Sequence, residues 1–311
     1  MAPVTLSGME ANGLLAPELS GEIFKRVREE SAVLRVAGSA PMAITGNEYV
    51  IRTVEPEADI VEEAAPKPIS DIGLSTKTVT PVKAATIVYW SKEARMKNPG
   101  GVFSDIQDAM TKAIHRQIDQ AILHGKSAKS GATIPGVEYI NQTTNRVALG
   151  TSAITAGGLT ADFLAGYDTV VNADYDFTGF VADPRLRSQV IGAVDVNGRP
   201  VYQTSGTDLT APVSNFLGLP MTYSKATSGK IGGTADQGTR AFGGDFAGNL
   251  KVGFVDQISF RKTDQATLVD GGQTVSLWQN NMEAALVEAI FGWVIRDTAA
   301  FAAYDAEAAE G

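Results

Sequence analysis

FSDIQDAMTKAIHRQIDQAILH, residues 103–124, is the most strongly patterned stretch of this chain. Its larger apolar side chains recur every four residues, at Ile106, Met110, Ile114, Ile118 and Ile122. This spacing places them along one face of an α-helix. Gly125 marks the expected end, because glycine readily adopts the backbone conformation found just after a helix. At ~1.5 Å per residue the helix would be long enough to act as the spine of a domain.

An extended arm is expected ahead of this helix. Residues 49–54 and 74–90 are rich in Val, Thr and Ile and are typical of strands. Residues 55–71 between them carry several acidic side chains and three prolines, so they are too long and too polar for a tight hairpin turn. The sequence predicts a projecting hairpin, which an assembling subunit can lay across a neighbour.

The rest of the chain mixes helices and strands. Helices are expected near residues 160–173 and 183–194, where Asp183 and Pro184 are typical of a helix start. Residues 196–280 alternate strand-like segments with glycine-rich loops. The order predicts an α+β fold, because it contains neither a βαβ repeat nor the pattern of a barrel.

Composition excludes several classes of protein. The 311 residues contain no cysteine, so disulfide and thiol chemistry are excluded. The formal net charge of −9 argues against a protein that binds the phosphate backbone of nucleic acids through its overall charge. No window approaches the roughly 18 uncharged apolar residues that would span a bilayer, and the first residues do not resemble a signal peptide.

Three residues, one on the expected arm and two near the C-terminus of the chain, together fit one reaction. Lys67 offers a primary amine in the acidic loop, Asn281 a carboxamide, and Glu288 a carboxylate within an apolar run. Amine, amide and base suffice to form an isopeptide bond with loss of ammonia, and no cofactor is needed. The apolar surroundings of Glu288 in the sequence predict a raised pKa, which suits a base. Seven residues separate Asn281 from Glu288, roughly 10 Å along a helix or 23 Å along a strand, so one lysine cannot easily touch both in the same chain.

Each of these residues also has a plain structural interpretation. Lys67 could be a solvated surface lysine, Asn281 a turn residue, and Glu288 part of the polar face of a C-terminal helix.

Four local motifs resemble one family. They are Lys67-Pro68-x-Ser70-Asp71; Asp183-Pro184-Arg185 with Asn197-Gly198-Arg199; Leu217-Gly218-Leu219-Pro220 followed by Gly244-Asp245-Phe246; and Asn281-Met282 with Glu288. The chain resembles tailed-bacteriophage major capsid proteins of the Johnson fold (HK-ninety-seven-like), of the self-cross-linking type. Asp297 departs from the family pattern, which often has proline there.

The resemblance implies a domain layout. Residues 1–45 would form an N-terminal arm and 46–92 the extended β-hairpin loop. The peripheral domain would consist of residues 93–130, which include the spine helix 103–124, and residues 250–290. The axial domain would consist of residues 131–249 and 291–311.

The resemblance also implies a structural function. The chain would self-assemble as pentamers and hexamers into an icosahedral phage head around double-stranded DNA, without sequence-specific DNA contacts. Assembly would take place in the host bacterial cytoplasm, with a separate scaffolding protein, a portal and a decoration protein as candidate partners. Lys67 would be the cross-link nucleophile, Asn281 the acceptor and Glu288 the base. The protein would not be an enzyme beyond a single autocatalytic turnover.

Other functions are less well supported. An encapsulin-type nanocompartment shares the fold, but the lysine, asparagine and glutamate set argues against it. A monomeric hydrolase or binding domain lacks a recognisable active site. Gly125-Lys126-Ser127 resembles the end of a phosphate-binding loop, but Gln120 stands where its first glycine should be. His115 and His124 lack partners at metal-ligand spacing, so no metal or cofactor is expected.

Overall fold

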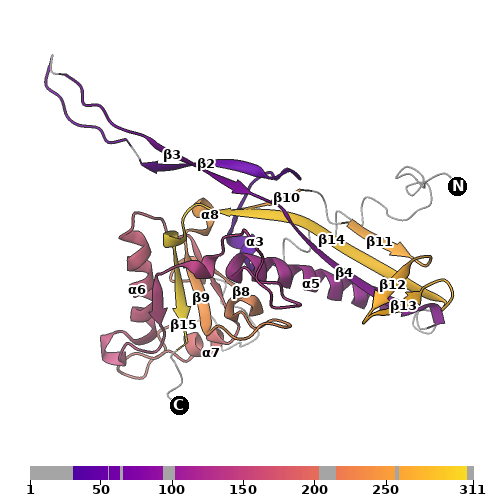
Figure 1. Cartoon of the computed structure of the whole chain (residues 1–311). Coiled ribbons are helices and arrows are strands. Elements are labelled where there is room, and N and C mark those ends of the chain that lie inside the picture. Colours follow the sequence, from indigo (N-terminus) through magenta and orange to yellow (C-terminus); the bar gives the residue numbers. More distant parts are fainter. Residues whose placement is uncertain are drawn as a thin grey trace.

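The computed structural model describes residues 31–54, 56–63, 66–93, 102–202, 215–255 and 259–306. Two sheets and a long helix form the body, and a hairpin projects far from it (Figure 1). Most of the expected N-terminal arm, residues 1–30, lies outside these ranges. In the described part of the chain, no helix is long and apolar enough to cross a membrane.

A five-stranded sheet is built around the long strand β14 (Met282–Ile295). Strand β4 (Val82–Ser91) pairs antiparallel with one side of β14. On the other side, β11 (Ser259–Thr263) and β10 (Leu250–Phe254) follow one another along β14, both antiparallel to it. The short strand β1 (Gly38–Ser39) runs parallel to β10 at the edge.

Helix α5 (Val102–His124) confirms the predicted spine and packs on this sheet. Its four-residue repeat is buried at Met110, Ile114, Ile118 and Ile122. Alternate residues of β14 join them in one core: Ala285, Val287, Ala289, Phe291 and Trp293. Fully burying such a side chain contributes roughly 1.5–3 kcal/mol, so this contact is a main source of stability.

A six-stranded sheet forms the second part of the body, in the order β5-β15-β9-β6-β8-β7. Its strands are β5 (Arg146–Ala148), β6 (Gly179–Ala182), β7 (Asn215–Phe216), β8 (Leu219–Tyr223), β9 (Thr239–Gly244) and β15 (Phe301–Asp305). Helix α6 (Gly158–Val171) covers it through Phe163, which is fully buried among the rings of Phe180, Phe216 and Tyr304. The mixture of helices and sheets confirms the α+β class.

The helix expected at residues 183–194 is much shorter. Helix α7 spans only Leu186–Ile191. Asp183 does not act as its N-cap; its carboxylate accepts hydrogen bonds from the backbone N–H and the guanidinium of Arg185. The backbone N–H of Leu186 bonds to the Asp183 carbonyl, so a tight turn precedes the helix.

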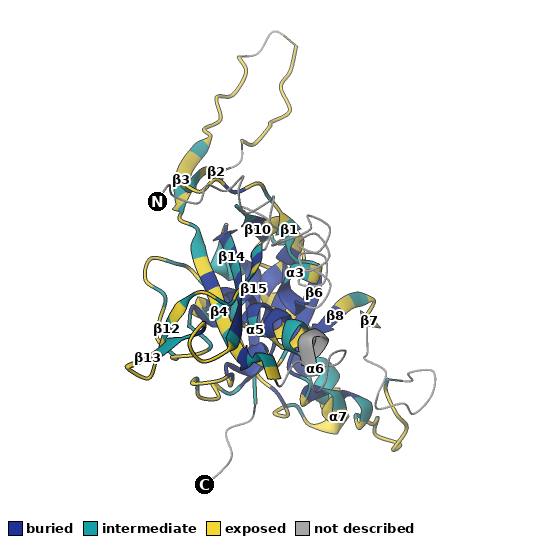
Figure 2. Ribbon diagram, turned by 90° about the vertical axis from the view of Figure 1, so that its right-hand side faces the viewer, coloured by how far each residue is buried: buried dark blue, intermediate teal, exposed yellow. Residues whose placement is uncertain are grey.

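The predicted projecting arm is present and exposed (Figure 2). Strands β2 (Asn47–Val54) and β3 (Gly73–Val79) pair antiparallel, and the described part of the segment between them is extended. The single strand expected over residues 74–90 is instead two, β3 and β4, separated at Pro81. Proline has no N–H to donate to a ladder, and at this point the chain changes its partner from β2 to β14.

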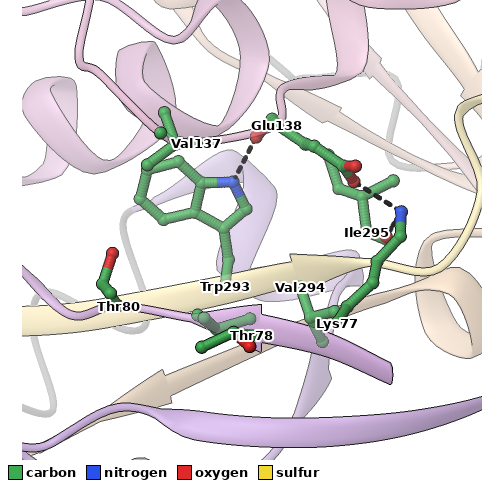
Figure 3. Close-up of a pocket in the computed structure, with 10 residues that line it drawn as sticks. Lys77, Thr78, Thr80, Val137, Glu138, Trp293, Val294 and Ile295 are labelled. Atoms are coloured by element: carbon green, nitrogen blue, oxygen red, sulfur yellow. Dashed lines mark hydrogen bonds and ion pairs between the residues drawn. The ribbon is translucent and has the colours of Figure 1, made fainter. Parts of the chain in front are cut away.

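A cluster of contacts fixes the base of the arm to the body (Figure 3). Lys77 of β3 forms an ion pair with Glu138 at 2.7 Å and donates to the carbonyl of Ile295 at 3.0 Å. The indole of Trp293 donates to the backbone carbonyl of Glu138 at 2.7 Å. These residues line a cavity of about 150 Å³ where β3 leaves the body.

Asp119 connects the spine helix to two other segments. Its carboxylate accepts from Ser31 Oγ at 2.5 Å and Ser224 Oγ at 2.7 Å, and from the backbone N–H groups of Ala32 and Val33. Ser31 also caps helix α3 (Ala32–Val36). Burial raises the pKa of Asp119, and these hydrogen bonds oppose the rise.

His124 makes folding sensitive to acid. Its ring lies buried between the carbonyl of Thr227 and the side chain of Asn141, and burial lowers its pKa to about 4. An unfolded histidine binds its proton near pH 6.5, so the unfolded chain gains a proton that the folded chain does not. Stability is therefore lost as pH falls from about 6.5 to 4, by up to about 3 kcal/mol.

The variant His124→Gln should flatten that pH dependence. The measurement is the free energy of unfolding in urea at several pH values in this window. Acidic groups with lowered pKa, such as Asp236 at about 2, begin to lose their contribution near pH 5 in both proteins, so the readout is the difference in slope between the variant and the parent. An unchanged slope in the variant would assign the acid sensitivity to another group.

Candidate cross-linking site

Asn281 lies in a strained turn just before β14. Its φ is 52°, in the left-handed region that asparagine tolerates better than most residues. The turn is closed by hydrogen bonds from Asn281 N to Trp278 O and from Met282 N to Leu277 O. The carbonyl of Asn281 accepts from the backbone N–H of Lys92 at 3.0 Å. The turn interpretation of Asn281 is therefore correct, and its side chain is exposed.

The carboxamide of Asn281 contacts a carboxylate that the sequence analysis did not identify. Nδ2 of Asn281 donates to Oε1 of Glu93 at 2.6 Å. Glu93 follows β4 by two residues and is exposed. The hydrogen bond from Asn281 lowers the pKa of the Glu93 carboxyl, so the group is a carboxylate at neutral pH.

Glu288 lies in the middle of β14, which rules out its placement on a C-terminal helix. Its carboxylate pairs with Lys83 of β4 at 2.6 Å and lies 3.6 Å from Arg261 of β11. Ser259 Oγ donates to it at 3.4 Å. Lys83 and Arg261 stand diagonally opposite Glu288 on the two flanking strands, so all three share one face of the sheet.

The expected rise in the pKa of Glu288 is wrong. The hydrogen bond from Lys83 holds the pKa of this carboxyl below its usual value, although desolvation acts in the opposite direction. In a strand, successive side chains point to opposite faces. The apolar neighbours Val287 and Ala289 therefore pack against the core on the far face, while cations surround Glu288.

Lys67 lies on the projecting arm and is exposed. The two sides of the arm are held together there by Ser70 Oγ, which accepts from the backbone N–H of Glu57 at 2.8 Å. The arm extends from one end of the body, whereas β12 (Thr267–Asp270), β13 (Gln273–Ser276) and the start of β14 lie at the other (Figure 1). A single subunit therefore does not bring Lys67 to Asn281.

Apolar side chains flank both separated groups. Ile60 and Ile69 of the arm are 98% and 97% exposed. Trp278, in the turn that holds Asn281, is 74% exposed. The other two tryptophans, Trp90 and Trp293, are buried. The single subunit leaves these apolar side chains in water, which disfavours their exposure.

Metal chemistry finds no support in the described residues. Across the ranges given above, no group of three or more His, Cys, Asp or Glu side chains could hold a metal ion.

A projecting hairpin, a spine helix on one sheet and a second helix-covered sheet define the HK-ninety-seven-like class of viral shell subunits. The model of the phage capsid family matches residues 11–306, and the chain belongs to that family.

Similar proteins come from bacteriophages. The "Probable major capsid protein gp17" of Mycobacterium phage D29 is 30% identical over 301 residues, covering 94% of this chain and 89% of the relative. The protein of the same description from Mycobacterium phage L5 is 30% identical over 305 residues, covering 93% and 88%. A solved structure from Gordonia phage Cozz superposes with a TM-score of 0.76 at 30% identity, covering 90% of this chain and 87% of that one.

Proposed function

We propose that this chain is the major capsid protein of a phage head. It assembles as pentamers and hexamers into an icosahedral shell around double-stranded DNA. The observation that carries the proposal is the arm, whose apolar side chains Ile60 and Ile69 are almost fully exposed in one subunit. A second subunit that covers them removes this apolar surface from water. The match to the phage capsid family and the names of the relatives support this function.

The proposed layout keeps residues 93–130 and 250–290 as the peripheral domain and 131–249 with 291–311 as the axial domain. The sheet around β14 with helix α5 supports the first, and the six-stranded sheet with α6 supports the second. These bounds place β4 in the hairpin loop and residues 291–295 of β14 in the axial domain, but both segments pair within the sheet around β14. The arm is the extended loop. The encapsulin alternative is less well supported, because the relatives at 30% identity are phage proteins.

Covalent links between subunits would stabilise the shell. The Lys67 amine of one subunit attacks the side-chain carbonyl carbon of Asn281 in another, and ammonia leaves. Glu288 accepts the proton that frees the amine. Because Asn281 and Glu288 are seven residues apart along an extended strand, about 23 Å, the lysine reaches both only where subunits meet. Each site reacts once, so the protein is not a turnover enzyme.

Assembly also supplies the environment that the amine needs. A lysine amine is almost wholly protonated in water at neutral pH and must lose a proton to attack. Ile69 beside Lys67 and Trp278 beside Asn281 exclude water when the two surfaces meet. Desolvation favours the neutral form of an amine, so the reaction is coupled to assembly.

The other partners expected for a phage shell are packaged DNA and the proteins that assemble with the shell. The net charge of −9 suits a wall against which packaged DNA slides without sequence-specific contacts. The protein is a virion component that assembles in the host bacterial cytoplasm. A separate scaffolding protein, a portal and a decoration protein would act with it.

Mass spectrometry of proteolysed mature shells tests the chemistry. We expect a branched peptide in which Lys67 is joined to Asn281 with the loss of one ammonia. Shells that yield only the two linear peptides would contradict the cross-link and leave the capsid function standing. Purified protein that stays monomeric under all assembly conditions would contradict both.

A further inference from the structure

The hydrogen bond between Asn281 and Glu93 fixes the orientation of the acceptor amide. A carboxylate only accepts hydrogen bonds, so the group facing Glu93 must be the NH₂ of Asn281 and not its oxygen. The Nδ2 atom is the one that leaves as ammonia when an amine attacks the amide. Glu93 therefore touches the leaving group itself.

The backbone holds this pair together within one subunit. Met282 pairs with Ser91 at the end of the β4–β14 ladder, and Lys92 N donates to Asn281 O one step beyond. The left-handed conformation of Asn281 then turns its side chain toward Glu93. Because sheet pairing sets this geometry, every subunit carries its own acceptor amide with its own carboxylate.

We propose that Glu93 is a second catalytic carboxylate, which relays a proton from the attacking amine to the departing nitrogen of Asn281. The inference rests on the proposed cross-link between Lys67 and Asn281. Two carboxylates then divide the proton transfers. Glu288 takes a proton from the Lys67 ammonium before attack, and Glu93 moves a proton from the attacking nitrogen to the departing one.

The protons balance. The ammonium of Lys67 loses one proton to Glu288 and attacks the Cγ carbon of Asn281 as a neutral amine. A second proton passes from the attached nitrogen to Glu93 and from there to Nδ2. The Cγ–Nδ2 bond breaks, ammonia leaves, and the new amide keeps the third hydrogen.

Glu288 cannot carry the second proton within the acceptor subunit. It lies about 23 Å along β14 from Asn281. Glu93 is in contact with Nδ2 already, and it is ionised at neutral pH because the hydrogen bond from Asn281 lowers its pKa. Once attached, the attacking nitrogen is acidic enough to give its proton to such a carboxylate.

Mixed shells test the proposal. One chain carries Lys67→Arg, so it supplies only the acceptor amide of the cross-link. The other chain carries Asn281→Gly, so it supplies only the attacking lysine. Glycine suits the φ of 52° at this position and has no amide. Co-assembled shells of these two chains link only between unlike chains, and denaturing gels sampled over time give the rate.

Glu93→Gln is then placed in either chain. Glutamine can still accept from Nδ2 but cannot relay a proton. In the acceptor chain we expect linkage to slow by about 100-fold or more, the typical contribution of a positioned general acid or base. In the donor chain, which has no acceptor amide of its own, the same substitution should not slow linkage. Asp264→Asn in the acceptor chain is the matched control, because it removes a nearby carboxylate that pairs with Lys92 and does not touch Asn281.

Two other outcomes would contradict the proposed role of Glu93 as a proton relay. Linkage could instead proceed at the same rate with Glu93→Gln in the acceptor chain and in the donor chain. This result, whether or not linkage is slowed, would show that Glu93 has only a structural role or none. Exclusion of the Glu93→Gln chain from shells, seen by electron microscopy, would assign Glu93 to folding or assembly. Absence of linkage in wild-type shells would instead overturn the proposed cross-link itself, so the two failures are distinguishable.

Discussion

Lys67→Arg is expected to leave shell assembly intact and to abolish the covalent links between subunits. Arginine keeps the positive charge and the length of lysine, so the contacts of the exposed arm are preserved. A guanidinium stays protonated in proteins and does not supply a neutral nitrogen to attack an amide. Electron microscopy should show normal shells, and a boiled denaturing gel of the same shells should show a single band at the mass of one chain.

Lys77→Arg is the matched control on the same hairpin. Lys77 pairs with Glu138 and Ile295 at the base of the arm, a contact that arginine can also make, so this variant should still cross-link. Links that persist in Lys67→Arg would place the nucleophile elsewhere. Loss of assembly in Lys67→Arg would mean that the lysine has a packing role, against the purely chemical role proposed for it.

Asp119→Ala is expected to lower the free energy of unfolding by about 3–5 kcal/mol. The substitution leaves the buried hydroxyl of Ser31, the hydroxyl of Ser224 and two backbone N–H groups without their acceptor. Each buried donor left unsatisfied costs about 1–3 kcal/mol, offset in part where a hydroxyl rotates to a new partner. Urea denaturation of unassembled subunits measures the loss.

Two variants on the same helix calibrate that result. Asp119→Asn keeps one acceptor oxygen and the side-chain volume, so we expect a loss of about 1–2 kcal/mol. Lys112→Ala changes an exposed position of α5 and should stay within about 0.5 kcal/mol of the parent. If Asp119→Ala were as stable as Lys112→Ala, the carboxylate would not be what joins α3 and the segment after β8 to the spine.

The sequence predicts those parts of the fold that depend on local pattern. The four-residue repeat of α5 needs only one apolar face and one sheet to cover it, and both are present. The hairpin is also recognisable, because a long acidic, proline-containing segment cannot form a tight turn. Pro81 carried the signal for the break between β3 and β4, since a proline inside a strand removes a ladder hydrogen bond.

The site is harder to predict because its environment is set by distant residues. The apolar run around Glu288 suggested a desolvated base, but strand alternation sends those neighbours to the other face. The residues that lower its pKa, Lys83 and Arg261, come from two other strands. Glu93 is 188 residues from Asn281, and only the register between β4 and β14 brings the two together. No spacing rule in a single sequence contains that register.

The most direct test of this account is a denaturing gel of boiled, wild-type mature particles. Subunits covalently linked through Lys67 and Asn281 should run as a ladder of dimers, pentamers, hexamers and larger species, or fail to enter the gel. Intact mature shells that dissolve into a single band at the mass of one chain would contradict the cross-link. Such shells would be held by interlocking arms and non-covalent contacts alone.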